Sequence, residues 1–217
     1  MEISDAVRLL DRELGEVFGS RLQSFIAYAH ASTNRNRPSS TLAILASLTT
    51  DDLRACAGRA RSWHEAGAET PLLLESQEFA RSLDAFPFEF GGILANHVIV
   101  SGIDPFVGLV VDPEDLRRAC EVRARSHLLH LREGYIETHG RSDAVADLIQ
   151  RSAGPLAALL TSVGRLTGTA VGDATLTRVT ELHDGRPIAP AEARSLFPAY
   201  LEAVVSLTKY VDRWNSR

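Results

Sequence analysis

The sequence predicts an α+β protein in which an N-terminal mixed β-sheet with packed helices is followed by an all-α four-helix bundle. In the first half of the 217 residues, short apolar runs typical of strands alternate with helical segments, whereas the second half consists of long segments with helical spacing. Charge divides at the same place, because residues 1–108 hold 14 acidic and 9 basic residues and residues 109–217 hold 14 of each. We therefore expect two domains, 1–108 and 109–217.

The first half alternates between helical and strand patterns. Ser4 is a typical N-cap, and Val7, Leu10 and Leu14 follow it at helical spacing. Polar residues between the apolar runs are typical of loops. We expect further helices from Thr50 to about Glu65 and from Gln77 to Leu83, and strands over 22–31, 41–48, 71–76, 86–94 and 97–102.

The second half opens with a strong helix start. Asp112 is a suitable N-cap, Pro113 stands at the first helical position, and acids follow in the first turn. That helix should run to Gly140. Further helices are expected over 143–166 with a kink or break at Gly154-Pro155, over 173–182, and over 192–214. Short loops between four helices indicate an antiparallel bundle.

Composition excludes several classes of protein. The formal charge of −5 and the pI near 5.8 argue against strong binding to nucleic acid. The sequence lacks the run of about 18 apolar residues that a membrane-spanning helix requires. Its acidic start does not resemble a signal peptide, and Cys56 and Cys120 are too isolated for a metal pair or a disulfide framework. We expect a cytoplasmic protein that does not bind membranes.

Several stretches share their layout with a known family. They are LQSFIAYAHAS, RPSSTLAILASL, the segment from Asp51 to Pro105, and the opening of the bundle, SHLLHLREGYIETHG. In this layout the chain resembles the predicted bacterial nucleotidyltransferases of the DNA polymerase β superfamily, which are similar to kanamycin nucleotidyltransferase in domain order. The resemblance implies a nucleotidyltransferase fold followed by a helical bundle.

The sequence departs from this family where its chemistry should be. Active members carry a Gly-Ser turn after the first strand and two acids, two residues apart, at the start of the second. The acids hold Mg²⁺ ions that bridge the nucleotide phosphates during in-line displacement. The turn position here reads Ala29-His30, and the acid pair falls on Ser40 and Leu42, or on Thr41 and Ala43 if the register moves by one.

No register restores the acids, because the sequence has no Asp or Glu between Glu16 and Asp51. A hydroxyl or methyl group cannot replace a carboxylate as a principal Mg²⁺ ligand. We therefore interpret the first domain as a degenerate nucleotidyltransferase fold, a pseudoenzyme for which no cofactor is expected. It would serve as a binding or regulatory module.

If nucleotide binding survives, the sequence places it at the corner between the first two strands. Arg side chains, hydroxyls and a histidine gather there, and together they could form an anion pocket. The candidate residues are Tyr28, His30, Ser32, Arg35, Arg37 and Ser40.

Two alternatives stay open. An active nucleotidyltransferase could take its Mg²⁺ ligands from elsewhere, for example Glu75 and Glu89, or Asp51 and Asp52. The chain could instead be an interaction protein, half of a toxin–antitoxin-like pair, and it could form a homodimer through its last helix.

The bundle contains an Arg–His spacing that resembles helical nucleases of the HEPN type. Arg125 and His130 fit it, but several other pairs in this Arg-rich half fit as well, so the pattern is unspecific. His127 shares a helix face with Leu131 and Tyr135, which favours a core or interface role over that of a metal ligand.

Overall fold

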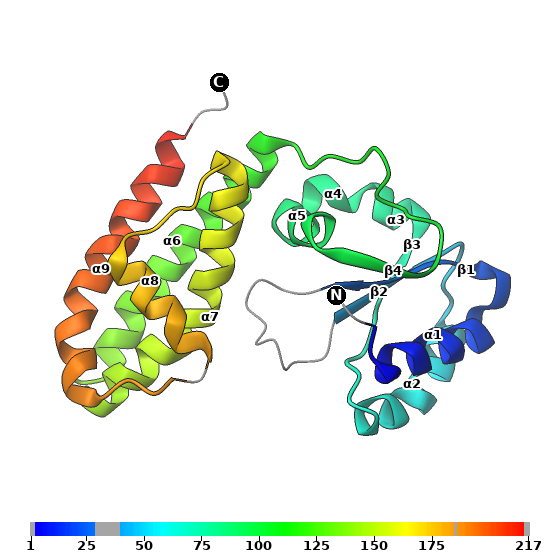
Figure 1. The fold of residues 1–217 in the computed structure, drawn as a ribbon, viewed down its shortest axis with the longest axis horizontal. Coiled ribbons are helices and arrows are strands. Elements are labelled where there is room, and N and C mark those ends of the chain that lie inside the picture. The colour runs from blue at the N-terminus through cyan, green and yellow to red at the C-terminus, as the bar shows by residue number, and fades with distance from the viewer. Residues whose placement is uncertain (1–2, 29–39, 185, 215–217) are drawn as a thin grey trace. The chain divides into compact units, whose positions relative to one another are not determined.

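The computed structural model describes residues 3–28, 40–184 and 186–214. They divide into two compact units, one up to Val111 and one from Asp112 onward (Figure 1). The first unit carries a four-stranded mixed sheet with helices, and the second is helical throughout the part described. The predicted α+β class is confirmed.

The sheet has the strand order β3-β2-β1-β4. Strand β1 pairs antiparallel with both β2 and β4, whereas β2 and β3 run parallel. Parallel neighbours require a crossover, and helix α2 supplies it. The strands are β1 (Leu22–Tyr28), β2 (Ser40–Leu45), β3 (Leu72–Glu75) and β4 (His97–Gly102).

Helices cover both faces of the sheet. Helices α1 (Asp5–Phe18) and α2 (Thr50–Glu65) lie on what we call the first face (Figure 1). Side chains alternate along each strand, so Phe25 and Ala43 join the cluster of the first face, and Ile26 and Leu42 join that of the second. The second face is covered by α3 (Ser76–Ala80), α4 (Ser82–Ala85), α5 (Pro87–Ala95) and Phe106.

Both helices of the first face begin at the caps that their sequences suggest. Ser4 caps α1 through the Val7 N–H, and Thr49 forms a capping box with Asp52 at the start of α2. A short 3-10 helix, η1 (Gly19–Arg21), leads from α1 into β1. Its Arg21 guanidinium donates two hydrogen bonds of 2.7 Å to Asp52. Bonds from Arg21 and Thr49 hold the pKa of Asp52 far below its usual range.

The prediction of a strand over 86–94 is wrong, because this segment forms helix α5. The alternating Phe residues imitate a strand, but Pro87 occupies the first helical position, where its missing N–H costs nothing. Phe90 and Ile93 are both buried in the second-face cluster. Residues three apart share a face of a helix but lie on opposite faces of a strand.

Two other elements differ in detail from the prediction. The predicted buried strand 71–76 is the edge strand β3, where Leu72 remains 44% exposed because no strand lies beyond it. The predicted helix 77–83 divides into α3 and α4. Arg81 ends the first of them, and its N–H bonds to the Glu78 carbonyl.

The second unit is built on three long helices that pack on one another, with a shorter fourth. Pro155 lies inside α7 and Pro198 inside α9, and both helices continue past them, so the predicted break at Gly154-Pro155 is wrong. Proline removes one backbone hydrogen bond inside each helix. Both helices pack against α6, and this packing stabilises the helical conformation through the proline position. The elements are α6 (Pro113–Glu137), α7 (Ser142–Thr167), α8 (Ala174–Glu181), a 3-10 turn η2 (Leu182–Asp184) and α9 (Pro190–Arg213).

A buried polar chain links the three long helices. The Tyr200 hydroxyl of α9 lies 2.7 Å from His127 Nε2 of α6 and 3.0 Å from Ser152 Oγ of α7. Ser152 also donates to the Ile149 carbonyl, so one consistent direction runs from His127 through Tyr200 and Ser152 to that carbonyl. Burial lowers the pKa of His127 to about 4, which keeps it neutral at pH 7. His127 is therefore a core residue, as its helix face predicts.

No helix in the described part of the chain combines the length and the apolar character needed to cross a membrane.

Candidate ligand-binding corner

Three polar side chains from three neighbouring strands form a row at one end of the sheet. Tyr28 ends β1, and its cross-strand partners are Ser40 at the start of β2 and His97 at the start of β4. Directly paired residues project from the same face, which here is the second face. Antiparallel pairing thus brings together residues that are up to 69 positions apart in the sequence. We call this set the Ser40–Tyr28–His97 row.

Carboxylates lie at both ends of the row. Ser40 Oγ donates to Glu69 over 3.0 Å, and His97 Nε2 lies 3.9 Å from Asp104 Oδ1. Burial raises the pKa of the Tyr28 phenol, and the charge of Glu69 raises it further, so the hydroxyl stays protonated at pH 7. The described part of the corner therefore has a negative potential and suits hydrogen-bond donors or cationic groups.

His97 has a defined tautomer. Its Nδ1 lies 3.0 Å from the Ile93 carbonyl oxygen, which can only accept, so Nδ1 carries a proton and donates it to this bond. The ring packs on Phe106 with a centroid distance of 4.6 Å, which fixes its orientation. The Nε2 atom of His97 is therefore the ring nitrogen that can form a hydrogen bond with a group entering the corner.

Three of the four positions where the family resemblance implies acids are closed by packing, whereas the fourth, Ser40, is half-buried. In one register Leu42 is fully buried in the second-face cluster, where Phe90 and Ile93 pack, and in the other Ala43 is fully buried in the first-face cluster. Thr41 is 2% exposed, and its hydroxyl has no hydrogen-bond partner within the described residues. A carboxylate at any of these three positions would be surrounded by apolar atoms.

The alternative metal ligands do not converge on a site. Glu75 accepts the Leu48 N–H at 2.7 Å and caps α3, so its carboxylate serves the backbone. Glu89, placed by sequence on a strand, lies on helix α5. Asp52 is held by Arg21 and Thr49. Across the described ranges, no three His, Cys, Asp or Glu side chains are grouped so that they could hold a metal ion.

The Arg125–His130 pair of the bundle is not assembled either. Arg125 binds Glu121 and Asp212, whereas His130 Nδ1 lies 3.3 Å from Glu133 on the helix surface. Each side chain is thus bound to a different acid.

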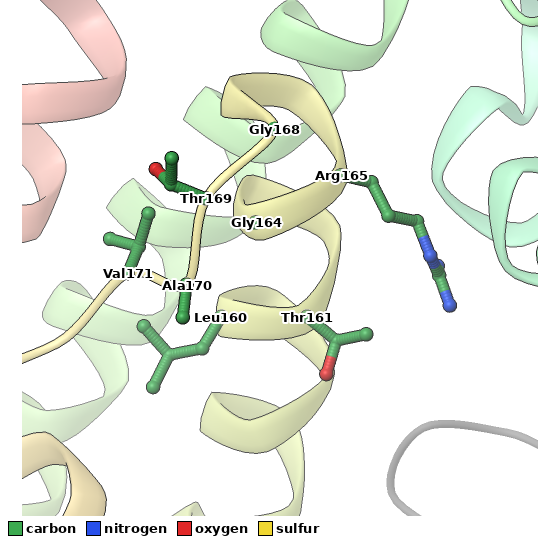
Figure 2. Close-up of a pocket in the computed structure, with 8 residues that line it drawn as sticks. All are labelled: Leu160, Thr161, Gly164, Arg165, Gly168, Thr169, Ala170 and Val171. Carbon is green, nitrogen blue, oxygen red and sulfur yellow. The ribbon is translucent and has the colours of Figure 1, made fainter.

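A shallow pocket of about 530 Å³ lies in the second unit, between the end of α7 and the segment that follows it (Figure 2). Gly164 allows this segment to pass closely, since a Cβ there would lie 3.3 Å from the Thr169 carbonyl oxygen. Figure 2 shows Arg165 extending away from residues 168–171 rather than over them. The side chains do not converge, so this pocket is a consequence of the turn.

Sequence reasoning found part of the corner. Tyr28 and Ser40 lie next to each other as predicted, whereas His30, Ser32, Arg35 and Arg37 fall outside the described residues. His97, Glu69 and Asp104 were missed, because only the strand pairing brings them to this edge. The one available signal was the position of His97 at the start of an apolar run.

Comparison with known proteins supports the fold. A solved structure of spectinomycin adenyltransferase AAD(9) from Enterococcus faecialis, with ATP and spectinomycin, aligns with a TM-score of 0.54 and 9% identity. The alignment covers 93% of this chain and 98% of that one. No protein-family model matches the sequence, and no curated protein sequence matches it significantly. The chain has a nucleotidyltransferase-like fold.

Proposed function

We propose that this protein is a nucleotidyltransferase-like pseudoenzyme that has lost metal-dependent nucleotidyl transfer and serves as a binding or regulatory module. The observation that carries the proposal is that, in either register, at least one position of the acid pair is buried. Leu42 and Ala43 are fully buried, and no acidic residue stands anywhere from Val17 to Thr50. Without two carboxylates, Mg²⁺ has no site from which to bridge nucleotide phosphates.

The Ser40–Tyr28–His97 row supports the binding half of the proposal. It presents a phenol, a serine hydroxyl and an imidazole in one line. These groups could recognise the hydroxyl and amino groups of a small polar ligand. Glu69 and Asp104 favour a ligand with a cationic group at this place. Such a ligand could also be the base or sugar of a nucleotide, provided that its phosphates point away from these acids.

The test is an assay of transfer combined with calorimetry. Purified full-length protein is incubated with radiolabelled ATP, Mg²⁺ or Mn²⁺, and spectinomycin as an acceptor, which is the compound in the structure of the similar protein. We expect no transfer above the metal-free control. Calorimetric titration of ATP and of spectinomycin, each alone, then measures binding in wild type and in the Tyr28→Phe and His97→Asn variants.

Two results would contradict the proposal. Metal-dependent turnover that survives the His30→Ala change would show that catalysis persists through ligands placed elsewhere. Binding that is unaffected by both the Tyr28→Phe and the His97→Asn variants would remove the row from the ligand site. The Tyr135→Phe variant, in which an exposed tyrosine of the bundle loses its hydroxyl, is the matched control.

A further inference from the structure

The outer face of the last two turns of α9 carries a groove of about 560 Å³. Its lining residues are Ser206, Lys209, Tyr210, Arg213 and Trp214. They recur at intervals of three and four, so they form one continuous stripe on the helix. The opposite face of the same turns, with Leu207 and Val211, is buried in the bundle. The groove is therefore separate from the core of the bundle.

The two cations of this groove have no acidic partner among the described residues. Neither Lys209 nor Arg213 forms an ion pair there, whereas the ion-paired arginines of the same unit are Arg117, Arg118, Arg125, Arg141 and Arg178. The closest acid in sequence, Asp212, binds Arg125 at 3.0 Å. Two unpaired positive charges one helical turn apart define a site for an anionic group.

Two aromatic side chains lie beside these charges. Tyr210 is 44% exposed, and Trp214 is half-buried. Basic residues near a helix C-terminus stabilise the helix dipole on their own, but that role does not require exposed aromatic rings. Aromatic faces next to cations bind planar rings by stacking, and every nucleobase or aromatic acid offers such a ring.

We propose that this groove is a second binding site, which takes a small planar aromatic anion. Lys209 and Arg213 hold the phosphate or carboxylate, Ser206 donates a further hydrogen bond, and the ring stacks on Trp214 and Tyr210. The shared chemistry is a flat ring with one anionic group close to it. A mononucleotide and an aromatic carboxylate both satisfy this description.

Fluorescence of Trp214 tests the proposal at the site itself. The chain has only two tryptophans, and Trp63 is 1% exposed inside the first unit, so a Trp214→Phe variant supplies its background signal. Wild type is titrated with AMP and, separately, with 2-naphthoate. We expect saturable quenching of Trp214 by at least one of them. Adenosine and inorganic phosphate, each with half of the required chemistry, should bind about tenfold more weakly or not at all.

Charge variants test the anion contacts. Lys209→Met and Arg213→Met should each weaken binding of the quenching ligand about tenfold, because each removes one charge-assisted contact. Arg194→Met is the matched control, since Arg194 is exposed on the same helix outside the groove. It should leave the affinity within about twofold of wild type.

The single lysine of the chain provides a second measurement. Reductive methylation with ¹³C-formaldehyde labels only Lys209 and the N-terminal amine, and the Lys209 signal should shift in step with the quenching. The proposal is overturned if neither compound quenches Trp214 up to millimolar concentration. Equal quenching by adenosine, or unchanged affinity in both charge variants, would also overturn it. The proposal is also overturned if raising the protein concentration quenches Trp214 without any ligand, because the groove would then be an interface between copies of the chain.

Because ATP also fits the groove, the calorimetric titrations are repeated in the Arg213→Met variant, so that this experiment and the test of the proposed function fail separately. A ligand bound at the Ser40–Tyr28–His97 row would change heat release without quenching Trp214. Loss of Trp214 quenching would leave the transfer assay unaffected.

Discussion

Two buried polar positions, one in each unit, differ in whether their hydrogen bonds are satisfied. In the bundle, the hydroxyl of Tyr200 has two partners, His127 and Ser152, and the chain of bonds crosses all three long helices. In the sheet, the Thr41 hydroxyl is buried without a partner in the described chain, at a position where the family resemblance implies an acid. A satisfied network can specify how helices pack, whereas an unsatisfied hydroxyl only costs free energy. Under the proposed function, Thr41 marks a place where packing has replaced chemistry.

The largest expected effect comes from returning a carboxylate to the sheet. Ala43→Asp places a charge in the first-face cluster, so we expect the free energy of unfolding of the first unit to fall by at least about 3 kcal/mol. Urea denaturation followed by Trp63 emission measures this. Ala55→Asp, on the exposed side of α2, is the control and should cost less than about 1 kcal/mol. If Ala43→Asp folds normally and binds Mg²⁺, the sheet interior is an open site and the pseudoenzyme interpretation is wrong.

Acidification should weaken the bundle by a comparable amount. The pKa of His127 is about 4 in the folded protein and about 6.5 when unfolded, so the unfolded chain takes up the proton first as the pH falls. The stability contributed by neutral His127 is full above pH 6.5 and is lost between pH 6.5 and 4, by about 3 kcal/mol in total. Urea denaturation followed by Trp214 emission at several pH values measures it. The His127→Gln variant keeps a donor for Tyr200 and should show no loss in this window.

Removing one hydroxyl from the bundle network should have a smaller effect. Tyr200→Phe leaves His127 Nε2 without its partner in a buried site, and we expect a loss of about 2 kcal/mol. Thermal unfolding with Trp214 emission measures the loss, and Tyr210→Phe on the same helix is the exposed control. If Tyr200→Phe and Tyr210→Phe lower the stability equally, the hydrogen bonds of the Tyr200 hydroxyl contribute nothing measurable.

The smallest effect compares the same substitution in both units. Thr41→Val removes an unpartnered hydroxyl and should stabilise the first unit by about 1 kcal/mol. Thr208→Val removes a hydroxyl that donates to the Val204 carbonyl, and it should leave the second unit unchanged or slightly weaker. Urea denaturation curves of the wild type and the two variants measure the sign of each change in the free energy of unfolding. If both changes have the same sign, the contrast between an unpartnered and a bonded hydroxyl does not hold.

Most of the fold could be predicted because its helices begin at recognisable caps. Ser4 and Asp112 fix the starts of α1 and α6 by local hydrogen bonds that depend on neighbouring residues alone. The segment over 86–94 could not be assigned in this way, since its Phe spacing satisfies a strand, and only the docking of Phe90 and Ile93 on the sheet selects the helix. For this segment, packing on the sheet determines the secondary structure, and the local sequence does not.

The candidate site was less predictable for a related reason. Tyr28 and Ser40 flank one connection, so their proximity follows from two adjacent strands. His97 reaches the same edge only because β4 pairs with β1 on its other side, and no local pattern encodes that order. Missing acids are easier to recognise in a sequence than residues brought together by strand order.

The bidentate contact between Arg21 and Asp52 has an evolutionary consequence. It fastens the entrance of β1 to the start of α2, and β1 and β2 are paired along their lengths, so the ends of this hairpin are held by contacts outside the connecting residues. Loops tolerate sequence change better than the strands they connect, so we expect change in this hairpin to concentrate between its two strands. Such change would alter recognition at that edge while the paired strands stay the same.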